Sequence, residues 1–148
     1  METGLMVRRH TGFSLIELMI ALAIMAVLAG IGIPAYQSYV QTGYRRQAQA
    51  DLMAAAQSME RAFAARMSYA GLNTSPPFVT NSPVQGTAIY QLTVSSLTDS
   101  SFIITAEPLA DGPAAGTGLL RINHLGQRFW DKNNDGDTDD AGETSWED

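Results

Sequence analysis

Cysteine is absent from this 148-residue sequence, and charged residues make up only 16% of it. Without thiols the chain can form no disulfide framework, no thiolate metal site and no cysteine nucleophile. Histidine is almost as rare, since only His10 and His124 occur, and no nucleophile motif such as G-x-S-x-G is present. The clustered acids suit cation ligands or solvated charges better than a general acid–base pair. The sequence therefore predicts a protein that is not an enzyme.

Basic residues are also few, and the acidic residues that outnumber them are concentrated at one end. Removal of residues 1–12, which contain Arg8, Arg9 and Glu2, would reduce nine basic and fifteen acidic residues to seven and fourteen. Eight of those acids and one lysine lie in residues 131–148, so the rest of the shortened chain has no net charge. This distribution argues against a general nucleic-acid-binding face, leaves room for a local basic patch, and attracts cations to the carboxy-terminal end. The charge distribution is compatible with DNA as a partner, but it does not by itself indicate DNA.

A long apolar run occupies residues 13–33, where Glu17 is the only ionisable side chain among 21 residues. A helix of that length extends for about 31 Å, which matches the hydrocarbon core of a bilayer. Arg8, Arg9 and His10 precede the run, and positive charge on that side places the amino terminus in the cytoplasm. The run therefore predicts a single membrane span with the rest of the chain outside.

The start of this run, Gly12-Phe13-Ser14-Leu15-Ile16-Glu17, closely resembles the processing site of the type IV pilin family. The resemblance implies a leader at residues 1–12, removed by prepilin peptidase between Gly12 and Phe13, and N-methylation of Phe13. It also implies that Glu17 neutralises the amino terminus of a neighbouring subunit during assembly. A carboxylate in hydrocarbon is costly and is rarely kept without a partner; the alternative is a side chain that snorkels to the headgroups.

The apolar run ends at Gly30, Gly32 and Pro34, which either melt the helix locally or kink it with helix on both sides. Beyond Pro34 an amphipathic helix is predicted to reach about Met67. Its apolar stripe comprises Tyr36, Val40, Tyr44, Ala48, Leu52, Ala56, Met59, Phe63 and Met67. The opposite face carries Gln41, Arg45, Gln49, Ser58 and Arg66. Arg45 and Arg46 are either solvated or contact neighbouring subunits.

The second half of the chain predicts a small sheet. A polar loop covers residues 69–86, and strands are expected at 88–95, 101–107 and 118–123, forming an antiparallel meander of three or four strands. The predicted class is α+β, with a hydrophobic helix at 13–35 and a head at 36–148. This order resembles the pilin fold, and residues 120–128 resemble a strand and turn of minor type IVa pilins. Those pilins commonly close the carboxy-terminal loop with a disulfide, which this chain cannot form.

Oxygen ligands alternate in the acidic tail, around a glycine at position 136 that permits a sharp turn. This layout suits Ca²⁺, and the predicted ligands are Asp131, Asn133, Asp135, Asp137, Asp139 and Glu143. The last ligand of an EF-hand would fall on Gly142, so Glu143 is one residue late and the loop is not an EF-hand proper. Calcium would pin Phe129, Trp130 and Trp146 against the sheet; the alternative is a disordered, solvated tail.

The family resemblance implies a structural subunit of a type IV pilus that serves twitching motility, adhesion or DNA uptake. Its partners would be other pilins, prepilin peptidase and the inner-membrane assembly platform. The subunit would reside in the inner membrane before assembly and in the extracellular filament afterwards. Two alternatives remain open: a pseudopilin of a type II secretion system, and a minor pilin at the filament surface or tip that acts as a binding module.

Overall fold

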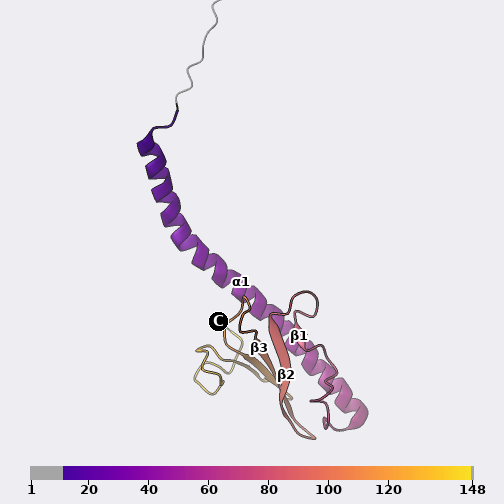
Figure 1. Ribbon diagram of the computed structural model, residues 1–148. Coiled ribbons are helices and arrows are strands. Elements are labelled where there is room, and N and C mark those ends of the chain that lie inside the picture. Colours follow the sequence, from indigo (N-terminus) through magenta and orange to yellow (C-terminus); the bar gives the residue numbers. More distant parts are fainter. Residues whose placement is uncertain (1–11, 148) are drawn as a thin grey trace, which may run out of the picture. The chain divides into compact units, whose positions relative to one another are not determined.

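The computed structural model describes residues 12–147, which fall into two compact units (Figure 1). The first unit extends to Ser38, and the second begins at Tyr39. The leader predicted at residues 1–12 lies outside the described residues except for Gly12, as do the basic residues at positions 8–10.

A single helix, α1 (Leu15–Arg66), begins in the first unit and ends in the second. Ser14 caps its first turn, because the Ser14 hydroxyl accepts a hydrogen bond from the Glu17 N–H at 3.2 Å. Pro34 lies inside the helix, so the structure shows helix on both sides of the proline rather than a melted stretch. The predicted end near Met67 is confirmed to within one residue, and Met67 itself has left the helix with a φ of 55°.

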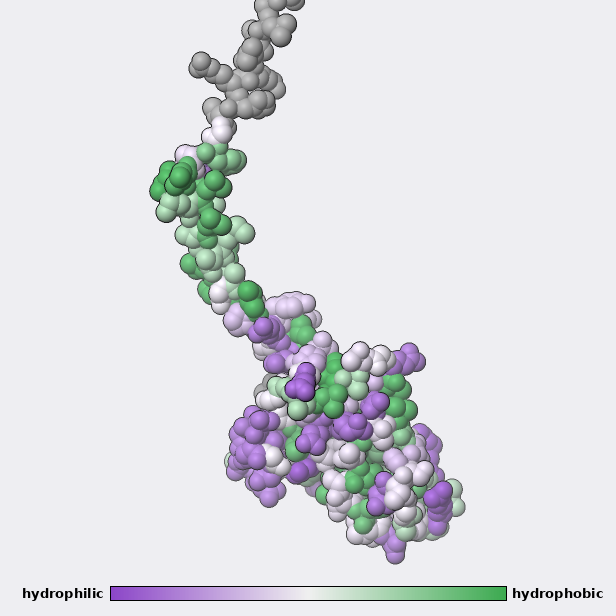
Figure 2. Space-filling model, viewed as in Figure 1, coloured by the Kyte–Doolittle hydropathy of each residue, from purple (hydrophilic) through white to green (hydrophobic). Residues whose placement is uncertain are grey.

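The first unit exposes almost nothing but apolar side chains. All residues from Gly12 to Ser38 are exposed, and the run of hydrophobic residues is visible along this part of the helix (Figure 2). By length and composition, α1 contains one segment that is apolar enough to cross a membrane. An uncovered apolar surface of this size is unfavourable in water, so the segment needs lipid or other protein around it.

The second unit contains a five-stranded antiparallel meander in the order β1-β2-β3-β4-β5 (Figure 1). The strands are β1 (Asn81–Ser82), β2 (Tyr90–Leu97), β3 (Phe102–Pro108), β4 (Leu120–Asn123) and β5 (Arg128–Trp130). The α+β class and the three long strands were predicted. β1 and β5 were missed, because two or three residues are too few to display an alternating pattern. β1 falls inside the segment that was predicted to be a loop.

The core of the head lies between one face of α1 and the sheet. Ala48, Leu52, Ala55 and Met59 are buried on the helix, and the sheet contributes Tyr90, Leu92, Phe102, Ile104, Ala106, Leu120, Ile122 and Trp130. The predicted apolar stripe is right in its middle and wrong at its ends, since Tyr36 and Met67 are 70% and 75% exposed. Tyr36 belongs to the uncovered first unit, and Met67 no longer follows the helical repeat.

Candidate functional site

The predicted processing and assembly residues lie at the exposed start of α1. Phe13 is 78% exposed, and a Cβ on Gly12 would meet no atom within 4 Å beyond Gly12 and its two chain neighbours. Glu17 is in the first helical turn, where a carboxylate is favoured by the helix dipole. Within residues 12–147 no hydrogen bond or ion pair reaches the Glu17 carboxylate. These groups are thus available to a molecule outside this chain.

The acidic loop, residues 131–140, is organised around the buried carboxylate of Asp131. One oxygen of Asp131 accepts the N–H of Asp135 at 3.1 Å, and the other accepts the N–H of Gly136 at 3.0 Å. Gly136 has a φ of 98°, which a residue with a side chain adopts only under strain. The predicted sharp turn is therefore present.

Beyond Asp131 the same pattern repeats along the loop. The side-chain oxygens of Asn133, Asp135 and Asp137 each accept the backbone N–H two residues later, at 3.0, 3.1 and 3.0 Å. The Asn133 amide also donates to the carboxylates of Asp135 and Asp140, both at 2.8 Å. Such bonds hold carboxylates close to one another despite their repulsion. The tail is folded into a defined loop, unlike the disordered alternative.

Glu143 ties this loop to the edge strand β5. Its Oε1 atom accepts the N–H of Lys132 at 2.9 Å, and its backbone carbonyl accepts the N–H of Trp130 at 2.9 Å. The side chain is 2% exposed, and its Oε2 atom is buried without a hydrogen-bond partner. Burying a carboxylate oxygen without a hydrogen-bond partner is energetically unfavourable. Such an oxygen is also a ligand that a hard cation prefers.

The oxygen atoms of the loop side chains have the donor chemistry that calcium prefers. Across the described part of the chain, no three His, Asp or Glu side chains are grouped in a way that could hold a metal ion. The predicted ligand set of Asp131, Asn133, Asp135, Asp137, Asp139 and Glu143 therefore stays a prediction.

Residues 143–147 form what we call the C-terminal strap, which covers the outer edge of β5. Besides the Glu143 contacts, the Trp146 indole N–H donates to the Phe129 carbonyl at 2.9 Å. Gln49 of α1 donates to the Trp146 carbonyl at 3.4 Å. Trp130 is buried and Trp146 packs against the core; the pinning of these aromatic residues by calcium stays a prediction. The strap closes the sheet edge without a disulfide.

Arg45 corrects the prediction that both neighbouring arginines are solvated or face other subunits. Its side chain is 8% exposed, and its guanidinium carbon lies 4.0 Å from the centroid of the Trp130 ring. A cation–π contact of this kind permits an arginine to be buried on an otherwise apolar helix face. Arg46, by contrast, is exposed as predicted.

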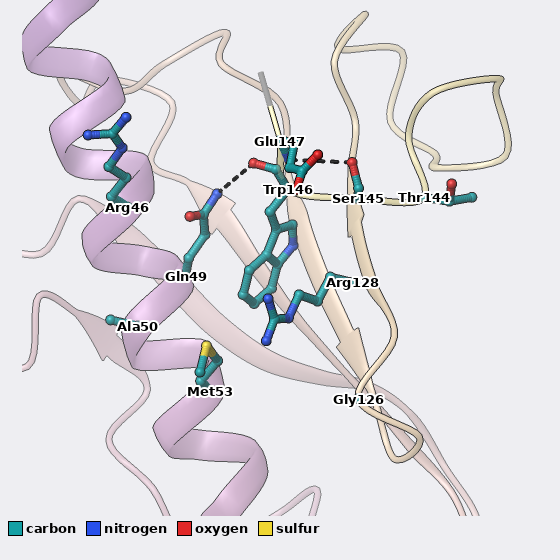
Figure 3. Close-up of a pocket in the computed structure, with 10 residues that line it drawn as sticks. All are labelled: Arg46, Gln49, Ala50, Met53, Gly126, Arg128, Thr144, Ser145, Trp146 and Glu147. Atoms are coloured by element: carbon teal, nitrogen blue, oxygen red, sulfur yellow. Dashed lines mark hydrogen bonds between the residues drawn. The ribbon is translucent and has the colours of Figure 1, made fainter.

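A groove that the sequence did not predict lies between α1 and the strap (Figure 3). We call it the α1–strap groove; its volume is about 510 Å³, and its walls include Arg46, Gln49, Met53, Arg128, Trp146 and Glu147. The guanidinium carbon of Arg128 lies 5.2 Å from the centroid of the Trp146 ring. These residues come from three segments far apart in the sequence, so no local pattern could have indicated the groove.

Two family models match this chain. Residues 34–118, more than half of the chain, match the family described as "Type IV minor pilin ComP, DNA uptake sequence receptor". Residues 7–33 match the prokaryotic N-terminal methylation motif, which covers the predicted processing site and Glu17. The acidic loop and the strap lie outside both matches.

Individual relatives are also pilins. The chain is 34% identical to a fimbrial protein of Neisseria meningitidis over 87 residues, covering 57% of this chain and 50% of the relative. It is 41% identical over 51 residues to the type IV major alpha-pilin of Moraxella bovis, covering 34% and 32% of the two chains. The matches thus span half or less of these relatives.

A solved structure shares the fold. The crystal structure of the non-core minor pilin PilV from Neisseria meningitidis superposes with a TM-score of 0.54 at 15% identity, covering 70% of this chain and 99% of that one. At this level of identity the likeness concerns the fold alone.

Proposed function

Because this chain belongs to the type IV minor pilin family, we propose that it is a structural subunit of a type IV pilus, assembled through the first half of α1. The observation that carries the proposal is the exposed apolar segment at residues 13–33, in which Glu17 is the one ionisable side chain. Pilins are structural proteins, and both the family match and the pilin relatives support this role.

The physical basis is that the apolar surface of α1 is covered equally well by lipid and by neighbouring helices. Covering a large apolar side chain gains about 1.5–3 kcal/mol, whether lipid tails or neighbouring helices provide the cover. The segment is therefore stable in the inner membrane before assembly and in the core of a filament afterwards. Positive residues ahead of the span favour a cytoplasmic amino terminus, which would make prepilin peptidase and the membrane assembly platform the first partners.

Glu17 supplies the specific contact in this scheme. After cleavage between Gly12 and Phe13, the Phe13 amine would be a cation at the start of the helix, and Glu17 of another subunit would neutralise it. An ion pair in an apolar environment depends strongly on both partners. Removing the carboxylate should therefore affect assembly more than it affects folding of the head.

The experiment compares Glu17→Gln with Glu107→Gln, a matched change at an exposed carboxylate on β3. We expect Glu17→Gln to reduce the amount of subunit in sheared pili by about tenfold and to leave its level in the membrane unchanged. Glu107→Gln should behave as the unmodified chain. Equal recovery of both variants in pili would contradict the assembly role, as would mature protein that still begins at Met1.

The pseudopilin alternative makes a different prediction for a deletion strain. Loss of exoprotein secretion with intact pili would favour the pseudopilin. Loss of piliation, twitching motility or DNA uptake with normal secretion would favour the pilin, which is what the family match supports.

A second proposed function is DNA binding by the head. It is supported by the description of the matching family as a DNA uptake sequence receptor and by two exposed arginines in the α1–strap groove. The test is natural transformation in a strain that lacks this chain. A strain that keeps its pili but no longer takes up DNA would support the proposal, and normal uptake would refute it.

Calcium binding by the acidic loop is the remaining proposal. It is supported by the ordered ladder of side-chain oxygens and by the unpartnered Oε2 atom of Glu143. Thermal melting of the full chain in detergent, with calcium and with chelator, provides the test. A higher melting temperature with calcium, absent in Asp135→Asn, would support the proposal; an unchanged midpoint would dismiss it.

A further inference from the structure

The α1–strap groove continues along α1 into a second hollow. The second hollow, of about 220 Å³, has Gln57, Glu60, Asn123 and His124 among its polar lining residues. Both hollows share Met53, Gly126 and Arg128 as lining residues, so they adjoin each other between the helix and the β4–β5 turn, and we refer to the two together as the channel. Two adjoining hollows suit an extended ligand better than a compact one.

Two cationic side chains lie along this channel. Arg46 extends from α1 and Arg128 from β5 (Figure 3), and both are exposed. In the part of the chain that the structure describes, no carboxylate forms an ion pair with either of them. Their N–H donors are therefore available to an anion that enters the channel.

Trp146 holds one of these cations in place. The Arg128 guanidinium lies 5.2 Å from the indole centroid, and the indole is itself fixed by its bond to the Phe129 carbonyl. An arginine stacked on an aromatic ring loses less freedom when it binds an anion, because its planar donor fork is already oriented. The strap thus positions a binding residue as well as closing the sheet edge.

The chemistry of the walls favours a phosphodiester chain. Guanidinium forks bind phosphate in a bidentate manner, and the side-chain amides and the imidazole of the second hollow can hydrogen-bond to bases or sugars. The acidic loop repels polyanions from its own part of the head, so binding would be confined to this channel. Glu147 of the first hollow and Glu60 of the second repel phosphates, so phosphate contacts would be limited to the positions of Arg46 and Arg128.

We propose that DNA binds along the α1–strap groove and its continuation, with Arg46 and Arg128 contacting phosphates. This assignment rests on the proposed DNA role of the head and names its site. Arg45 is excluded, because its guanidinium is buried against Trp130.

The experiment measures fluorescence anisotropy of a short labelled DNA duplex of mixed sequence with the full chain in neutral nanodiscs. For Arg46→Ala/Arg128→Ala we expect binding to weaken by about tenfold, and the slope of log K against log salt to fall by about 1.8, or 0.9 per lost phosphate contact. The control is Arg61→Ala/Arg66→Ala, which removes two exposed arginines of α1 outside the groove. It should change binding by less than about twofold.

Two further arms make the result decisive. Arg46→Lys/Arg128→Lys should retain the salt slope, which separates lost contacts from a misfolded groove. Equal weakening in the control pair would show diffuse attraction and overturn the proposal. Competition by polyglutamate as strong as by unlabelled DNA would identify an acidic polypeptide as the ligand and would also overturn it.

Failure of this inference can be told apart from failure of the proposed function. If the groove variants bind DNA as the unmodified chain does, while transformation still requires this protein, then DNA is bound elsewhere on the head and only the site assignment falls. If the unmodified chain binds no DNA and its deletion leaves transformation normal, both the site and the DNA role fall.

Discussion

The two units of this chain show what one helix can do with two kinds of surface. Up to Ser38 every described side chain of α1 is exposed, although nearly all are apolar. From Tyr39 onward the same helix buries Ala48, Leu52, Ala55 and Met59 against a sheet. The second unit buries its apolar helix face against its own sheet, whereas the first unit needs molecules outside the chain to cover its apolar side chains. Stability should therefore reside in one part of α1 and assembly in the other.

A pair of leucines on α1 offers the sharpest contrast in stability. Leu52 is fully buried, and Leu52→Ala should lower the free energy of unfolding of the head by about 2–5 kcal/mol through the cavity it leaves. Leu22 is 64% exposed, and Leu22→Ala should change it by less than about 0.5 kcal/mol. Denaturant unfolding in detergent, followed by tryptophan fluorescence, measures both. Similar losses of unfolding free energy in the two variants would contradict the claim that stability resides in the second unit.

The acidic loop allows the same comparison within the head. Asp131 is 2% exposed and accepts two backbone N–H groups, so Asp131→Ala should cost about 1–3 kcal/mol by removing the buried acceptor of two hydrogen bonds. Asp139 is exposed, and Asp139→Ala should have an effect below about 0.5 kcal/mol. Both values come from denaturant unfolding in the presence of chelator. An equal effect of the two changes would mean that Asp131 does not organise the loop.

Tyr69 gives the smallest expected effect, and one that depends on pH. Burial, together with the hydrogen bond that its phenol donates to Glu60 at 2.8 Å and the charge of that carboxylate, raises the pKa of Tyr69 from 10.0 to about 12. Because the folded state favours the protonated phenol, this stabilisation is complete below pH 10 and is lost as the pH rises through 12.

Melting temperatures between pH 9 and pH 12 test the role of Tyr69. Tyr69→Phe should show a shallower decline in this interval than the unmodified chain. A residual decline is expected, because burial raises the pKa of Tyr90 as well. Identical pH profiles for Tyr69→Phe and the unmodified chain would rule out the contribution of Tyr69.

Local patterns predicted the parts of this protein that local physics determines. The single helix, three strands within two residues of their observed starts, and the sharp turn at Gly136 follow from periodicity, β-branched runs and glycine. The burial of Arg45 could not be predicted, because its partner Trp130 is distant in the sequence and only the folded sheet brings them together. The α1–strap groove was missed for the same reason. Gly12, Phe13 and Glu17 were found as a contiguous motif, and their roles remain predictions.

The central claim is that the first half of α1 is covered by other subunits in the filament, and the absence of cysteine permits a direct test. Single cysteines would be placed by Ile24→Cys in the apolar segment and by Leu125→Cys in the head, at residues that are 55% and 69% exposed. Each variant is treated with a thiol-reactive maleimide, once as detergent-solubilised subunit and once as sheared pili. We predict that the head cysteine reacts in both states, whereas the cysteine in the apolar segment reacts in detergent and is protected in pili. Equal reaction of that cysteine in both states would contradict the account.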